Sequence, residues 1–152
     1  MHLPIQEFCT SDTPAFLCVA GPSGCGKTNL LRAIQSAAEQ ENNDCRVLLI
    51  ETHILLPYLL ESFQAKAYPA FVNRLAEYDI LLVDQLEELG DKYTTREEVI
   101  HLFRELLGRG VSVAVSICIR TNNPMDTELY ETFESHSFSE NQYAVVWQKE
   151  LK

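Results

Sequence analysis

The sequence predicts an α/β fold of three layers, in which helices cover both faces of a five-stranded parallel sheet. Apolar runs of strand length alternate along the chain with segments of helical periodicity. A glycine-rich loop separates the first strand from the first helix, and a later apolar run ends at Asp84. Because open parallel sheets bind ligands at the carboxyl ends of their strands, we expect the loop and Asp84 to form one site.

The first half of the chain contains a β-α-β unit followed by a helical region. Short apolar runs predict buried strands at residues 15–20 and 46–51. Helical periodicity predicts three helices, at residues 29–39, 54–65 and 69–77. Prolines stand early in the last two of these segments, where a first helical turn tolerates them.

The second half continues the alternation of strands and helices. Apolar and β-branched runs predict strands at residues 80–84, 111–117 and 143–147. A capping box at residues 95–98 predicts the start of a helix that ends at a pair of glycines. A short helix is expected at residues 126–133.

Length and composition predict one domain with an N-terminal extension. The chain has 152 residues, of which 46% are hydrophobic, and we divide it into residues 1–14, a loop-like extension, and residues 15–152, the domain. It has no apolar stretch of the ~20 residues that span a membrane, and no signal-peptide pattern at its start. Five widely spaced cysteines, without a C-x-x-C pair, indicate neither disulfides nor zinc. We therefore expect a cytoplasmic protein.

The charge balance argues against direct DNA binding. Twenty-two acidic residues against twelve basic ones give a net charge of −10, and the basic residues form no stripe along the sequence. Non-specific affinity for nucleic acid comes mainly from Lys and Arg, so we interpret the acidic residues as a solvated surface.

The glycine-rich loop is typical of phosphate binding. Gly21 and Gly26, with four residues between them, are followed by Lys27 and Thr28. This spacing fits the phosphate-loop pattern, in which backbone N–H groups and a helix N-terminus surround an anion. Lys27 is expected to contact the β- and γ-phosphates, and the Thr28 hydroxyl to bind Mg²⁺. A glycine-rich turn without a ligand would not explain these two residues. The candidate cofactor-binding residues are Gly21, Ser23, Gly24, Cys25, Gly26, Lys27, Thr28 and Asn29.

Asp84 is the second candidate metal ligand. An isolated aspartate at a strand end is usually a turn residue, but a phosphate loop upstream favours a metal role for this one. A carboxylate at the end of a buried parallel strand is the arrangement that holds Mg²⁺ beside a bound nucleoside triphosphate. We therefore favour Thr28 and Asp84 as the metal site.

These motifs together resemble the ATPase core of the AAA+ class of P-loop NTPases, in its branch of bacterial replication initiators, the DnaA and Hda family. The resemblance extends from Pro14 to about Trp147. It is most specific in residues 78–89, which are similar to the family's Walker B strand, and in residues 95–106, similar to the helix after it. The segment 29–34 resembles the family's first helix.

The resemblance implies binding of ATP or ADP with Mg²⁺ at Lys27, Thr28 and Asp84. It also implies a part in nucleotide-dependent assembly on DNA, or in its control, through a protein partner in the replication machinery. The chain ends at Lys152, so we expect no lid domain and no DNA-binding domain.

Departures from the family pattern predict weak or absent hydrolysis. Gln85 stands where the family usually has a second acid, and an amide orients water but does not take its proton. Hydrolysis then depends on whether Glu87 or Glu88 substitutes; we take Gln85 and Glu88 as the candidate catalytic residues. Residues 132–138, where the family's arginine finger would fall, contain no arginine.

Two alternatives stay open from the sequence. The chain could be a small active ATPase or a P-loop phosphotransferase, or it could be a former nucleotide-binding domain retained for protein contacts. The sequence does not determine the oligomeric state.

Overall fold

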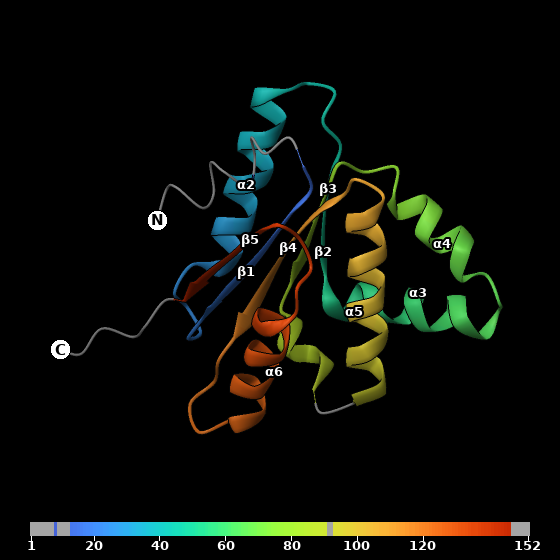
Figure 1. Ribbon diagram of the computed structural model, residues 1–152. Helices are drawn as coiled ribbons and strands as arrows, with labels where there is room; N and C mark the ends of the chain where they lie inside the picture. Colours follow the sequence, from blue (N-terminus) through green and yellow to red (C-terminus); the bar gives the residue numbers. More distant parts are fainter. Residues whose placement is uncertain (1–7, 9–12, 91–92, 147–152) are drawn as a thin grey trace.

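A computed structural model describes residue 8 and residues 13–90 and 93–146 of the chain (Figure 1). Its centre is a parallel sheet with the strand order β2-β3-β4-β1-β5. The strands are β1 Ala15–Gly21, β2 Val47–Glu51, β3 Ile80–Asp84, β4 Ser112–Cys118 and β5 Asn141–Val146. The predicted five-stranded parallel sheet is therefore confirmed. β5 begins two residues earlier than predicted, and Trp147 lies outside the described residues.

Helices cover both faces of this sheet. They are α2 Lys27–Glu41, α3 Thr52–Gln64, α4 Tyr68–Leu75, α5 Tyr93–Gly108 and α6 Pro124–Ser135. Alternate residues of β1 point to opposite faces. Leu17 and Val19 pack with the apolar residues of α2, whereas Phe16 and Cys18 pack with those of α3 to α6. Figure 1 shows α2 on the opposite side of the sheet from α5 and α6, which confirms the three predicted layers.

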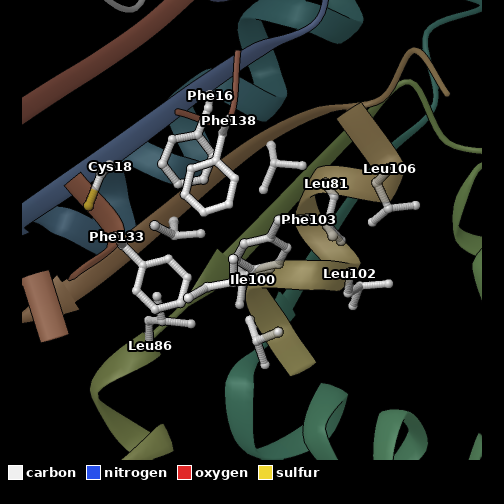
Figure 2. Close-up of a cluster of buried hydrophobic side chains, with 14 of the residues drawn as sticks. Phe16, Cys18, Leu81, Leu86, Ile100, Leu102, Phe103, Leu106, Phe133 and Phe138 are labelled. Carbon is white, nitrogen blue, oxygen red and sulfur yellow. The ribbon is translucent and has the colours of Figure 1, made fainter. Parts of the chain in front are cut away.

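A cluster of phenylalanines packs α5 and α6 against the sheet. Phe103 of α5 lies between Phe16 of β1 and Phe133 of α6, with ring centroids 6.3 Å and 6.0 Å away (Figure 2). Phe138, from the segment between α6 and β5, stacks on Phe16 at 4.3 Å. The cluster fixes the two helices that follow the third and fourth strands.

Two local features differ from the predicted elements. A short 3-10 helix, η1 Leu86–Leu89, follows β3 directly, and both its leucines are buried. α5 begins at Tyr93, two residues before the predicted capping box. Arg96 is buried and donates from Nε and Nη2 to the carbonyl of Gly90, at 2.9 and 2.7 Å, so it ties the helix to the preceding turn.

Strand register brings the predicted site residues to one edge of the sheet. Gly21 is paired with Cys118, and Asp84 with Glu51. The carboxyl ends of β1, β3 and β4 therefore lie side by side, where the loop after β1 begins.

Two further predictions concern the N-terminal extension and the absence of a membrane-spanning segment. Most of the predicted extension, residues 1–14, lies outside the described residues, although Phe8 is buried against the α2 side of the sheet. Among the helices that the structure describes, none has the length and apolar character needed to cross a bilayer.

The phenylalanine cluster predicts a large loss of stability on truncation. Phe103→Ala should reduce the free energy of unfolding by about 3–5 kcal/mol, because it leaves a cavity among three other rings. Chemical denaturation measures the change. Tyr58→Ala is the control, since Tyr58 is 60% exposed and its truncation should change stability by less than about 0.5 kcal/mol. Equal stability of the two variants would contradict this packing.

Candidate functional site

The loop from Gly21 to Thr28 connects β1 to the first turn of α2. Gly24 and Gly26 have φ angles of 80° and 98°, in the left-handed region that glycine adopts without the steric cost of a Cβ. Gly26 is the N-cap residue of α2, a helix of 15 residues, and Lys27 is its first residue. The loop thus turns into a helix N-terminus, where unpaired N–H groups and the helix dipole favour an anion.

A pocket of about 340 Å³ lies over this loop at the edge of the sheet. Its walls come from the loop and the start of α2, from the turn after β3, and from the end of β4. The lining residues are Ser23, Gly24, Gly26, Lys27, Thr28, Asn29, Asp84, Gln85, Glu87, Ser116 and Cys118.

Two of the predicted cofactor-binding residues do not line this pocket. Gly21 ends β1, and its carbonyl accepts a hydrogen bond from Ile119 N at 2.9 Å. Cys25 lies beside Lys27, with Sγ and Nζ 3.5 Å apart. The remaining six predicted residues of the loop and α2 contribute directly to the wall.

Lys27 places a buried cation in the wall of the pocket. The residue is 8% exposed, and its Nζ donates to the carbonyl of Pro22 at 2.7 Å. An ammonium group has three N–H donors, so this bond leaves capacity for phosphate oxygens.

Asp84 is a buried carboxylate whose two oxygens are both hydrogen-bonded. Oδ2 accepts from the Thr28 hydroxyl at 2.8 Å, and Oδ1 accepts from the Ser116 hydroxyl and from Gln85 N at 3.1 Å. Its backbone carbonyl accepts from the hydroxyl of Thr52 at 2.9 Å. Residues from three segments therefore fix this side chain, and Thr52 of α3 fixes its backbone.

The oxygen atoms at Thr28 and Asp84 fit a magnesium ion chemically. Mg²⁺ prefers hard oxygen ligands and usually takes one or two from protein, with phosphate and water completing its coordination. Within the residues that the structure describes, no group of three or more His, Cys, Asp or Glu side chains could hold a metal. A cation at this place would therefore need ligand oxygens in addition to those of the protein.

Gln85 follows Asp84 in a left-handed backbone conformation, with φ 60° and ψ 52°. This conformation costs a residue with a Cβ roughly 1–2 kcal/mol. The Gln85 N–H donates to the Ser116 hydroxyl at 2.8 Å, which helps to offset the cost. Gln85 is also among the residues that line the pocket, next to the predicted metal site.

The neighbouring acids Glu87 and Glu88 point in different directions. Glu87 lines the pocket, and its Oε1 accepts from Cys118 N at 2.8 Å. Burial raises the pKa of Glu87 above its ordinary value. Glu88 instead contacts the start of α3, where its Oε1 accepts from His53 N at 3.0 Å and lies 3.2 Å from His53 Nδ1. The structure thus brings Gln85 to the pocket and directs Glu88 to α3.

Sequence reasoning missed Thr52 and did not assign Ser116 to a partner. Thr52 directly follows Glu51, the parallel neighbour of Asp84, so the register of β2 and β3 would have located it. Ser116 lies one register step beyond Val115, which pairs with Val83. Locating either residue at the site requires the order of the strands in the sheet, which local sequence patterns do not reveal.

A second hollow of about 460 Å³ adjoins the phosphate pocket. It shares Thr28, Asp84 and Gln85 with that pocket. Its other walls come from α2, from the end of β2 and from Ile54 of α3, which is 45% exposed. The residues predicted to hold the metal thus border both the pocket over the loop and a hollow beside α3.

Comparison with known proteins places these features in a family. The model of the bacterial DnaA ATPase domain matches residues 7–142 of the chain. The chromosomal replication initiator protein DnaA of Microcystis aeruginosa is 33% identical over 115 residues, which is 76% of this chain and 24% of that protein. The DnaA of Symbiobacterium thermophilum is 30% identical over 110 residues, 70% of this chain and 24% of that protein. The chain thus spans about a quarter of the length of these relatives.

Solved structures of two proteins have a similar fold. Domain III of the Thermotoga maritima replication initiation protein DnaA matches with a TM-score of 0.69 at 22% identity, covering 96% of this chain and 59% of the other. The DnaC helicase loader matches with a TM-score of 0.68 at 18% identity, covering 95% and 86%. These two likenesses concern the fold alone. Because the family model spans most of the chain, the resemblance drawn from the motifs is confirmed, and the chain belongs to the bacterial DnaA ATPase domain family.

Proposed function

We propose that this domain binds ATP or ADP with Mg²⁺, hydrolyses ATP slowly, and acts in replication initiation through a protein partner. One observation carries the proposal: the Lys27 ammonium and the hydrogen-bonded pair of Thr28 and Asp84 lie in the wall of one pocket over a glycine loop. Phosphates need this combination of a cation, backbone N–H donors and a metal-binding acid.

The residues of the pocket have separable tasks in nucleotide binding. The N–H groups of the loop and of the first turn of α2 would donate to phosphate oxygens, and Lys27 would neutralise their charge. Thr28 and Asp84 would hold Mg²⁺, which when bound neutralises the phosphates further. A solved DnaA structure of similar fold is described as bound to AMPPCP and single-stranded DNA, which supports a nucleotide as the ligand.

Slow hydrolysis follows from the residue after Asp84. An acid at this position would take the proton of the attacking water, whereas the amide of Gln85 can only orient it. Gln85 is among the residues that line the pocket, where its amide would orient a water without supplying a base.

A protein partner fits the charge and the surface better than direct DNA binding does. A net charge of −10 repels the phosphate backbone of DNA. α3 exposes Ile54 and, one turn further along the helix, Tyr58. Ile54 lines the second hollow, which shares Thr28 and Asp84 with the nucleotide pocket. A partner that contacts α3 would there be sensitive to the bound nucleotide. The relatives are named chromosomal replication initiator proteins, which supports a partner in replication initiation.

Loss of the buried cation should abolish most nucleotide affinity. Lys27→Ala is expected to weaken ATP binding by at least about 10-fold, since hydrogen bonds to charged groups contribute about 1.5–3 kcal/mol each. Isothermal titration calorimetry with ATP and Mg²⁺ measures the affinity of each protein. Arg74→Ala removes an exposed positive charge on α4 and should leave the affinity unchanged. If wild type binds neither ATP nor ADP at millimolar concentration, the proposed function is wrong.

Replacing the proposed metal ligand Asp84 should make the affinity for ATP independent of Mg²⁺. Asp84→Asn keeps the size of the side chain but removes the anionic oxygen that would hold the ion. Wild type should bind ATP more tightly with Mg²⁺ than with EDTA, and the variant should show little difference between the two titrations. An unchanged Mg²⁺ effect in Asp84→Asn would exclude the carboxylate as its ligand.

Restoring an acid after Asp84 should raise turnover. Gln85→Glu preserves the length and shape of the side chain, so the left-handed backbone is not further strained. General-base catalysis typically contributes about 100- to 10,000-fold, and we expect a rise in steady-state phosphate release of at least 10-fold over a slow wild type. Wild-type turnover of several per second would contradict the role assigned to Gln85.

A further inference from the structure

The phosphate pocket contains a carboxylate that nucleotide binding does not use. Among the described side chains that line it, the acids are Asp84 and Glu87. Both oxygens of Asp84 are already hydrogen-bonded, and its place beside Thr28 assigns it to the metal. Glu87 therefore needs a separate explanation.

Glu87 is held at the pocket from two sides. Its backbone belongs to η1, which is fixed to the core by the buried side chains of Leu86 and Leu89. Its side chain crosses to the end of β4, where Oε1 accepts the Cys118 N–H at 2.8 Å. A carboxylate has two oxygens, so holding Oε1 on the backbone orients Oε2 without consuming it.

The surroundings of Glu87 raise its affinity for a proton. Burial raises its pKa, as does the negative charge of Glu88 on the same turn, whereas Lys27 across the pocket and the Cys118 N–H lower it. The charge of Arg120, after β4, also interacts with Glu87. A carboxylate whose pKa is raised toward the working pH is a stronger base than an ordinary one and still accepts a proton.

We propose that Glu87, rather than Gln85 or Glu88, is the general base for the slow hydrolysis of ATP in this domain. The inference rests on the proposed function. The Glu87 carboxylate takes a proton from water while the water oxygen forms a bond to the γ-phosphorus. The bond between that phosphorus and the β–γ bridging oxygen breaks, and the electron pair leaves with ADP. Glu87 then releases the proton to solvent, so that ATP and water yield ADP, inorganic phosphate and a proton.

This assignment gives Gln85 and Glu88 supporting parts. The Gln85 amide, which lines the same pocket, orients the water for Glu87. Glu88 contacts His53 on α3 instead of the pocket, so it holds η1 against that helix. The two adjacent glutamates form a matched pair of test positions, because the same substitution removes a charge inside the pocket at one and outside it at the other.

The test compares Glu87→Gln with Glu88→Gln in the same chain. Steady-state phosphate release from ATP with Mg²⁺ is measured for both, with Lys27→Ala as the blank for contaminating activity. Glu87→Gln should lower turnover by about 10-fold or more, because the amide still accepts the Cys118 N–H but takes no proton. Glu88→Gln should turn over ATP as the wild type does, and the wild type, Glu87→Gln and Glu88→Gln should bind ATP with similar affinity.

A second measurement separates chemistry from structure. Wild-type turnover should fall as the pH is lowered through the pKa of Glu87. This fall should occur at a higher pH than an ordinary glutamate would give. The residual turnover of Glu87→Gln should not show this decrease at low pH. Intact ATP binding together with equal turnover in wild type and Glu87→Gln would overturn the inference. So would intact binding without any wild-type turnover, or an equal loss in Glu88→Gln. Absence of ATP binding in wild type would instead overturn the proposed function itself.

Discussion

The hydrogen bonds to the Asp84 carboxylate hold the site together. Asp84 is 4% exposed, and a buried charge costs several kcal/mol unless donors replace the water it loses. The hydroxyls of Thr28 and Ser116 and the N–H of Gln85 are those donors, and they come from α2, β4 and the turn after β3. The phosphate loop, two strands and the next turn are therefore fixed to one another through a single side chain.

This arrangement explains the backbone after β3. For its N–H to meet both Asp84 Oδ1 and the Ser116 hydroxyl, Gln85 adopts the left-handed conformation, and the chain turns directly into η1. Burial of the leucines at both ends of η1 then orients the two acids between them. One glutamate is directed to the end of β4 and the other to α3.

The sequence predicted what depends on local pattern and missed what depends on contacts across the sheet. Apolar runs were sufficient to predict the five strands, and the glycine pattern predicted a loop between the first strand and the first helix, where β1 meets α2. η1 has only four residues, too few for periodicity to reveal it. The choice between Glu87 and Glu88 was open in the sequence, because it depends on Cys118 and His53, which lie about thirty residues away in either direction. Thr52 was missed for the same reason, since its partner is the backbone of a neighbouring strand.

Under the proposed function, the charges in the pocket would couple nucleotide binding to a cation. Lys27 contributes one positive charge to the wall, whereas Asp84 and Glu87 contribute two negative ones when ionised. The phosphates of a nucleotide add further negative charge to a site that is partly shielded from water, where like charges repel strongly. The helix N-terminus offsets only about half a charge. Under the proposed function, a divalent ion held by Thr28 and Asp84 would balance this charge, and the same ion would make it possible for a carboxylate at residue 87 to remain close to the terminal phosphate.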